Sequence, residues 1–238
     1  MLSFRSSFIG FLSLMVAYLP ASSVAQGITS SVATNVYMEA YNIRGRAFEN
    51  KDAVLYDGTP LLNDNWGKGS VTFKDGKIVK ELELKFNLEK NELYFNREGG
   101  MFLFNDPIAS FQISYGTGNR ISVSNFKSGY PVNGRLGEQV FYEIIFEGPR
   151  FHMLSFRYAY LGDANRYGGG VKQAFVNGEE LYVYDVAAKS MHRVKRQEAS
   201  FKDALPKIQD KITQICSENK LKLKNNDELI KLFTILNQ

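Results

Sequence analysis

The chain has 238 residues, 44% of them hydrophobic, and a formal net charge of +4. This is ample for a real core in one large or two small domains. A single cysteine, Cys216, excludes an internal disulfide, so the fold must rest on its core, and a small buried hydrophobic role is expected for this thiol. The only histidines, His152 and His192, lack metal-ligand spacing, so neither a metal nor a cofactor is expected.

Residues 1–25 have the pattern of a secretory signal peptide. Arg5 precedes an apolar run, Phe8–Leu19, and Ser23 and Ala25 occupy the two positions that signal peptidase reads. The run is shorter than the roughly 20 residues that a membrane-spanning helix needs. We therefore expect cleavage after residue 25, no stable transmembrane anchor in the mature chain, and export to the periplasm or beyond the cell.

Residues 35–194, which follow a small and polar lead-in at 26–34, predict an antiparallel β body. Ile78–Phe86 alternates apolar and charged residues, as a half-buried strand does. Asp75-Gly76, just before this strand, predicts a hairpin turn because both residues tolerate positive φ. Two more turns separate predicted strands, at Glu98–Gly100 and at Gly148-Pro149.

A second hairpin dipeptide, Asn177-Gly178, predicts a turn between the strands Gln173–Val176 and Leu181–Val186. Glu179 and Glu180 follow this turn, and successive strand residues point to opposite faces. We therefore expect solvated turn charges here and not the converging carboxylates that glycoside hydrolysis needs.

Three glycine-containing stretches predict loops: Gly116–Arg120, Ser128–Gly137 and Gly168–Gly170. None of them has the spacing of a phosphate-binding loop. A structural role is expected for each.

Residues 195–238 predict two or three helices that pack on the β body. Pro206 fits the first turn of a helix that runs to about Asn219. A residue of the segment Asn225–Asp227 caps the last helix. Each helix has an apolar stripe, made of Ile208, Ile212, Ile215 and Cys216 in the first and of Leu229, Ile230, Phe233 and Leu236 in the second.

Charge is unevenly distributed along the chain. From Lys189 to the end there are 11 Lys and Arg against 6 Asp and Glu, a net of +5, whereas residues 26–188 have a net of −2. This basic segment fits peripheral contact with an anionic surface or an acidic partner, or simply a solvated lysine face. No nucleic-acid partner is expected, because no recognition motif accompanies the charge.

No catalytic residue can be assigned from the sequence. Glu143 and Glu147 are predicted to lie on one side of a strand, where they would make a polar cleft. No GxSxG motif is present, so acyl transfer has no recognisable nucleophile. Trp66 suits an aromatic side chain that pins a loop to the sheet, in preference to a stacking platform for sugars or lipids.

The segment Gly58–Gly69 (GTPLLNDNWGKG), the turn at Gly76 and the runs Leu84–Leu88 and Asn91–Leu93 resemble a group of uncharacterised exported proteins of the Bacteroidota. The lysine-rich segment Lys195–Asn237 extends the resemblance. It implies export and no assigned activity, so no functional residue is carried over.

The predicted fold is mainly β (α+β), an antiparallel curved sheet, sandwich or partly open barrel closed by two or three C-terminal helices. The expected function is that of an exported, non-enzymatic envelope or secreted protein, with a binding or structural role toward an unknown ligand or envelope protein. Two alternatives stay open. One is an extracytoplasmic hydrolase whose site is assembled only in three dimensions, and the other is a carrier of lipid or another apolar ligand.

Overall fold

The computed structural model describes residues 43–47, 56–117, 120–164 and 172–238. The predicted signal peptide (1–25) and lead-in (26–34) lie outside these residues. The strands are β1 (Gly45–Ala47), β2 (Gly67–Phe73), β3 (Ile78–Asn87), β4 (Glu92–Arg97), β5 (Gly100–Phe104), β6 (Ile108–Thr117), β7 (Arg120–Lys127), β8 (Tyr142–Glu147), β9 (Phe151–Ala164), β10 (Lys172–Asp185) and β11 (Ser190–Val194). The helical elements are α2 (Glu198–Ala204), the 3-10 turn η1 (Pro206–Ile208), α3 (Gln209–Glu218) and α4 (Asn226–Leu236).

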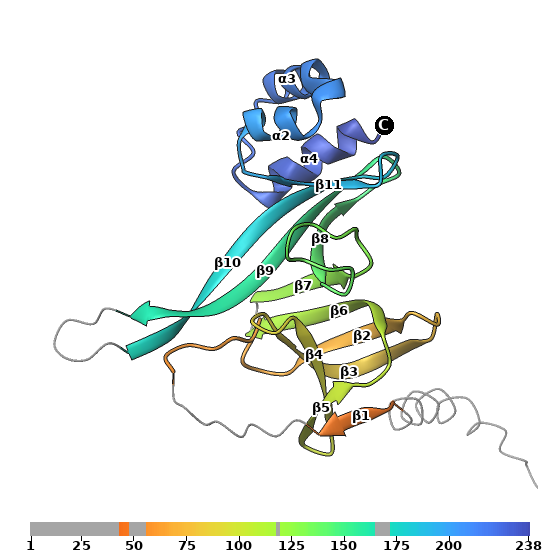
Figure 1. The fold of residues 1–238 in the computed structure, drawn as a ribbon, viewed down its shortest axis with the longest axis vertical. Coiled ribbons are helices and arrows are strands. Elements are labelled where there is room, and N and C mark those ends of the chain that lie inside the picture. The colour runs from red at the N-terminus through yellow and green to blue at the C-terminus, as the bar shows by residue number, and fades with distance from the viewer. Residues whose placement is uncertain (1–42, 48–55, 118–119, 165–171) are drawn as a thin grey trace, which may run out of the picture.

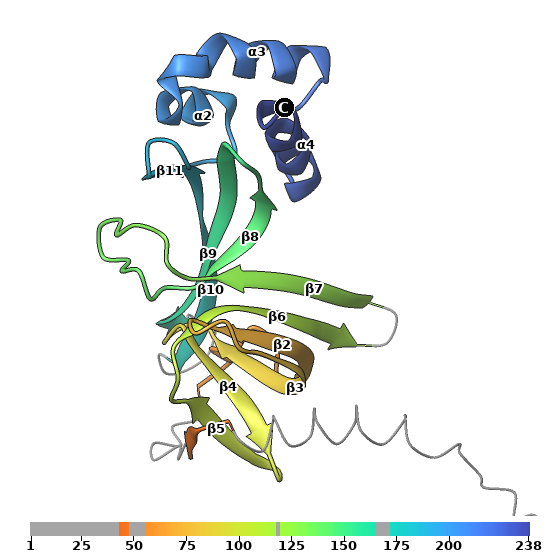
Figure 2. The same cartoon turned by 90° about the vertical axis from the view of Figure 1, so that its right-hand side faces the viewer.

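In the described part of the chain, the eleven strands form one sheet with the order β1-β5-β4-β3-β2-β6-β7-β8-β9-β10-β11. All neighbouring strands in it are antiparallel. The sheet is curved and does not close, and the helices cover the end formed by β8–β11 (Figures 1 and 2). The predicted class is therefore confirmed, in the form of a curved open sheet.

Two predicted hairpins in the first half of the sheet are confirmed. Between β2 and β3, Gly76 has φ of 89°, and the side chain of Asp75 accepts a hydrogen bond of 2.9 Å from the N–H of Lys77. Between β4 and β5, Glu98 and Gly99 have φ of 53° and 80°. Positive φ at both central residues, as in this second turn, is typical of a two-residue hairpin whose twist matches that of its strands, whereas in the first turn only Gly76 has positive φ.

The strands of the first half bury one face, as the alternation in β3 predicts: Leu82, Leu84 and Phe86 are all buried. The phenyl ring of Phe86 lies 5.1 Å from that of Phe111 and 4.9 Å from that of Phe126. Each such side chain stabilises the fold by about 1.5–3 kcal/mol through burial. We call the buried residues around this group the first cluster.

The predicted hairpin at Asn177-Gly178 is wrong. β10 continues through both residues and pairs with β9 from Lys172 to Asp185, with Gly178 opposite Tyr158. A Cβ on Gly178 would lie 2.3 Å from Cζ of the Tyr158 ring, so glycine serves close packing here. The turn lies instead at residues 186–189. A long ladder with β9 outweighs the local turn preference of two residues.

The helices bury the same sheet face at its other end. Met153, Leu181 and Val183 pack against them in a second cluster. As predicted, Pro206 lies in the turn before α3, and the side chain of Asn225 caps α4 by accepting a hydrogen bond from the N–H of Glu228 at 2.9 Å. We call this side of the sheet the helix-bearing face.

The predicted apolar stripe of α4 is wrong at one position. Ile230 is 39% exposed, whereas Leu232, which the stripe omitted, is fully buried. α4 packs against β8, β9 and α3 together, so the buried surface widens to the positions i, i+3, i+4 and i+7. These positions are Leu229, Leu232, Phe233 and Leu236.

The opposite face at this end is covered by the predicted loop at 128–137. Tyr130 and Leu136 of this loop pack on Tyr142 and Leu154 in a third cluster. The side-chain amide of Asn133 donates a hydrogen bond of 2.7 Å to the carbonyl of Met191 and fixes the loop. Residues 118–119 of one predicted loop, and all of the loop at 168–170, lie outside the described residues.

Replacing Phe233 with Ala is expected to lower the free energy of unfolding by about 3–5 kcal/mol, because the ring is fully buried among Phe146, Phe201 and the sheet. Ile230→Ala on the same helix is the matched control and should cost no more than about 1 kcal/mol. Urea unfolding of both variants measures the difference. Equal costs would mean that α4 is not anchored as described.

Candidate functional site

A polar cleft separates the first and second clusters on the helix-bearing face. The two halves of the sheet meet where β7 pairs with β8, and this pairing covers only Phe126–Glu143 and Lys127–Tyr142. Beyond these pairs the strands diverge, as Figure 2 shows. The resulting cleft has a volume of about 550 Å³. Its lining comes from β6, β7, β8, β9, β10, α4 and the turn after β3. It is mostly polar: Leu88, Tyr115, Ser122, Val123, Ser124, Glu143, Arg157, Asn177, Gly178, Glu179 and Asn226.

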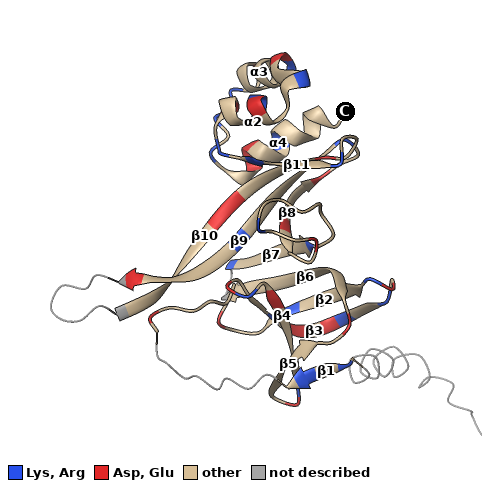
Figure 3. Ribbon diagram, in the orientation of Figure 1, with Lys and Arg blue, Asp and Glu red and all other residues tan. Residues whose placement is uncertain are grey.

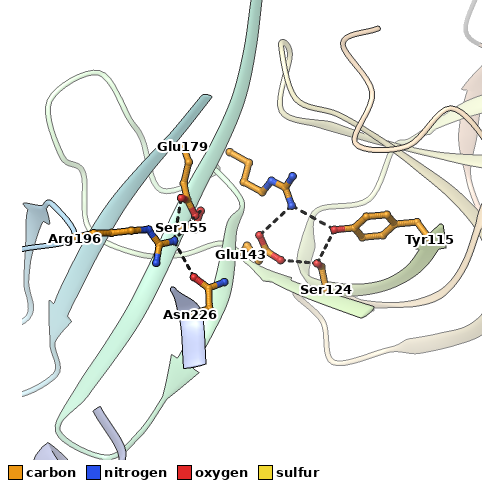
Figure 4. A network of polar contacts seen from close by, with 8 residues as sticks. Tyr115, Ser124, Glu143, Ser155, Glu179, Arg196 and Asn226 are labelled. Carbon is orange, nitrogen blue, oxygen red and sulfur yellow. Dashed lines mark hydrogen bonds and ion pairs between the residues drawn. The ribbon is translucent and has the colours of Figure 1, made fainter. Parts of the chain in front are cut away.

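Glu143 is the centre of one hydrogen-bonded group in the cleft (Figure 4). The hydroxyl of Ser124 donates to one carboxylate oxygen, and Nη1 of Arg157 lies 3.4 Å from the other. The same Nη1 donates to the hydroxyl of Tyr115 at 3.3 Å, and this hydroxyl is 3.2 Å from that of Ser124. The group thus joins β6, β7, β8 and β9 across the divergence of the strands.

Burial alone would lower the pKa of the Arg157 guanidinium. The carboxylate of Glu143 and the hydroxyl of Tyr115 outweigh this effect and raise its pKa above the ordinary value. Arg157 therefore stays charged, and Glu143, whose side chain is only 18% exposed, keeps a permanent counter-ion.

Glu179 is the centre of a second group (Figure 4). It accepts a hydrogen bond of 2.9 Å from the hydroxyl of Ser155 and forms an ion pair of 3.1 Å with Nη2 of Arg196. The same nitrogen of Arg196 donates at 2.8 Å to the side chain of Asn226, at the start of α4. This second group therefore ties the helical segment to the long ribbon of β9 and β10.

The prediction for Glu179 and Glu180 is right about their opposite faces and about the exposure of Glu179, whose side chain is 40% exposed, and wrong about the turn and about the exposure of Glu180. They lie in the middle of β10, not after a turn. Glu180 is not solvated: its side chain is 12% exposed, accepts a hydrogen bond of 2.7 Å from Tyr182 and pairs with Arg193 at 3.1 Å. The error follows directly from the misplaced hairpin.

The prediction that Glu143 and Glu147 share a side is also wrong. The register of β8 against β9 shifts between Ile144 and Phe146, so one extra residue lies between the two glutamates. Such a bulge reverses the side on which every later residue of the strand lies. Glu147 consequently pairs with Lys127 and lies near His152, away from the cleft.

The two histidines occupy different surroundings. His152 is nearly buried, and its Nδ1 lies 3.0 Å from the hydroxyl of Tyr130 and 3.9 Å from Glu147. His192 is exposed, and its Nε2 lies 3.0 Å from the hydroxyl of Ser190. His192 and Ser190 line a separate groove of about 590 Å³ between the β10–β11 hairpin and the helices, with a largely apolar lining.

Two other singled-out residues have packing roles. Cys216 is buried in the second cluster as expected, and burial raises the pKa of its thiol to about 11. Trp66 is half-buried at the start of β2, and Nζ of Lys85 on β3 lies 5.0 Å from the centroid of its ring. The indole therefore packs on the sheet, which agrees with a pinning role.

Several residues of the cleft were not found from the sequence, chief among them Arg157, Tyr115 and Arg196. One signal was available for Arg157, because its side of β9 otherwise presents Met153, Ser155 and Ala159, and a charge in such a row needs a buried partner. Nothing local identifies that partner, because Glu143 is 14 residues away.

In the described residues, no group of three or more His, Cys, Asp or Glu side chains is placed to hold a metal ion. Among the same residues, no helix is both long and apolar enough to cross a membrane. No protein-family model, curated protein or solved structure matches the chain. The resemblance to exported Bacteroidota proteins therefore stays a prediction.

Replacing His152 with Gln is expected to flatten the pH dependence of stability below pH 6.5. Burial lowers the pKa of His152 below its ordinary value of 6.5, although Glu147 opposes the effect. The unfolded chain thus binds this proton at a higher pH than the folded chain does. The stability contributed is complete above pH 6.5 and is lost as the pH falls toward the folded-state pKa.

Urea unfolding at pH 7.5 and pH 5 measures this effect, with the exposed His192→Gln as the control. The control should lose as much stability on acidification as the wild type. An equal loss in His152→Gln would contradict the assignment.

Proposed function

We propose that this chain is an exported, non-enzymatic binding protein of the cell envelope or the medium, and that its ligand occupies the polar cleft between the first and second clusters. The observation that carries the proposal is the mutual pairing of the cleft's charges. Each carboxylate accepts a hydrogen bond from a serine and lies against an arginine, Glu143 with Arg157 and Glu179 with Arg196. Such a surface is preorganised and close to neutral.

This pairing favours binding over catalysis. A general acid or base must be able to exchange its proton with a substrate, and a nucleophile needs an adjacent base. In the cleft both carboxylates are engaged, and the serines donate to carboxylates. A neutral, hydroxyl- and amide-lined cleft suits a ligand rich in uncharged hydrogen-bonding groups.

The basic C-terminal segment supports a subsidiary proposal, peripheral contact with an anionic surface. Lys220, Lys222, Lys224 and Lys231 are exposed. Basic and acidic residues are interspersed over this end of the molecule (Figure 3). Because these charges are exposed, added salt would screen them and weaken the contact.

Filling the cleft should abolish ligand binding. Ser122 lies on β7 with its side chain exposed at the cleft, outside both hydrogen-bonded groups. Ser122→Trp places an indole in the cleft, and Ser122→Ala is the matched control that leaves it open. The exported protein is purified from its native host, and native mass spectrometry identifies whatever stays bound.

The wild type and Ser122→Ala should carry the same ligand, and Ser122→Trp should lose it while its melting temperature stays within a few degrees of wild type. A ligand retained by Ser122→Trp would place the binding site elsewhere. It would refute the assignment of the cleft.

A second candidate, a hydrolase, is favoured by one observation: Ser190 and His192 lie within hydrogen-bond reach in the largely apolar groove. A serine beside an imidazole is the start of a nucleophilic site. The same groove is where a lipid or other apolar ligand would bind, if the chain is a carrier.

A fluorophosphonate probe tests the hydrolase candidate, because it labels activated serines. We expect no labelling of the wild type, since His192 is exposed and no described carboxylate forms an ion pair with it. Labelling that disappears in Ser190→Ala but persists in Ser155→Ala would instead favour the hydrolase.

A further inference from the structure

The edge of β7 that borders the cleft is unpaired in the described part of the chain. β7 pairs with β6 along its whole length, whereas β8 reaches it only at Phe126 and Lys127. The segment Ile121–Asn125 therefore has one paired edge and one open edge. Three successive residues of β7, Ser122 to Ser124, line the cleft although their side chains alternate in direction, so the strand edge itself forms that wall.

The phase of the β6–β7 ladder shows which backbone groups face the opening. The N–H of Ser128 donates to the carbonyl of Ala109, its direct neighbour on β6, at 2.9 Å. In an antiparallel pair the inward and outward residues alternate. The backbone groups of Ile121, Val123 and Asn125 accordingly point away from β6. The bridge between Phe126 and Glu143 occupies the carbonyl of Asn125, because the groups of Phe126 itself face β6. Three N–H and two C=O groups remain as a template for one more strand.

The side chains of β7 indicate which residue types an added strand would carry on each of its faces. Ser122 and Ser124 lie on the helix-bearing face, beside the polar lining of the cleft. Ile121 and Val123 lie on the other face, where they are 67% and 56% exposed. Their direct neighbours on β6 are Gly116 and Ser114, which give them no apolar partner. An added strand with apolar residues opposite Ile121 and Val123 would supply it.

We propose that the occupant of the cleft is an extended segment of another exported polypeptide, added as a strand to the open edge of β7. The inference rests on the proposed binding function and names its ligand class. The segment alternates β-branched apolar residues, on the side of Val123, with uncharged hydroxyl or amide residues, on the side of Ser122 and Ser124. Main-chain hydrogen bonds provide the affinity, and alternate side chains provide the selectivity.

The walls of the cleft favour a single strand over a second copy of this sheet. Opposite the β7 edge lie Arg157 and Glu179 of the β9–β10 ribbon, and Asn226 of α4 closes one side. A single added strand needs room only for its own width, whereas a second sheet approaching edge-on would meet these walls. Because Arg157 and Glu179 already have partners of opposite charge, the segment needs no charge of its own.

The probe for the test is a ten-residue peptide that alternates Val and Thr between terminal lysines. It is compared with the same peptide N-methylated at its valines, whose N–H groups face β7 in the proposed pairing. Binding to the full mature chain is measured by fluorescence anisotropy, and hydrogen exchange is followed residue by residue. The unmodified peptide should slow amide exchange at Ile121, Val123 and Asn125. Exchange at Ser122 and Ser124, whose amides already face β6, should stay unchanged. N-methylation should weaken binding about tenfold or more.

Val123→Pro removes one outward N–H at an edge position that tolerates proline, and should weaken binding of the unmodified peptide about tenfold. Val123→Ala, which keeps the N–H, is the matched control. If Val123→Pro does not fold, the N-methylated peptide on the wild type decides. Equal affinity for both peptides, no binding at about 1 mM, or no protection at the three amides would overturn the inference.

These outcomes are distinct from failure of the proposed function. One outcome is a small molecule that binds the wild type but not Ser122→Trp and leaves the three amides unprotected. It would support the proposed binding function and overturn the inference that the ligand is a polypeptide strand. A ligand that Ser122→Trp retains would overturn both.

Discussion

Among the described strands, the two halves of the sheet are joined by the pairs Phe126–Glu143 and Lys127–Tyr142, and much of the molecule depends on how that junction is held. A parallel bridge between Asp57 and Ala174 of β10 is a second link between the halves. Glu143 occupies it with 18% of its side chain exposed and is held by Ser124 and Arg157. Removing either partner would leave the largely buried carboxylate of Glu143 poorly compensated, which lowers the free energy of unfolding. The contact that holds β7 to β8 is therefore also part of the cleft lining.

The fold was predictable where local chemistry and long-range pairing agree. Asp75-Gly76 and Asn177-Gly178 carry the same hairpin signal, yet only the first forms a turn. β9 offers a continuous partner across the second dipeptide, and Gly178 is used there because the ring of Tyr158 needs the space. Helix positions were predictable for the same reason: the cap at Asn225 and the turn at Pro206 are local devices that no distant contact opposes.

The cleft was predictable only in part. Glu143 and Glu179 were singled out as carboxylates, but period-two alternation cannot anticipate the bulge between Ile144 and Phe146, which separates Glu143 from Glu147. Arg157 reaches Glu143 from β9 and Arg196 reaches Glu179 from the bend after β11, and sequence spacing carries no information on such pairing. A polar site assembled across a strand junction is visible only when the register is known.

The burial of Cys216 gives this protein an internal reporter of local opening. The sequence has one thiol, and it lies within the helical end, with its pKa raised to about 11. At neutral pH almost none of it is thiolate, and the thiolate is the species that reacts with alkylating reagents. The rate of labelling therefore measures how often the helices lift off the sheet, without any engineered cysteine. Cys216 thus reports the opening of the helical end relative to the sheet.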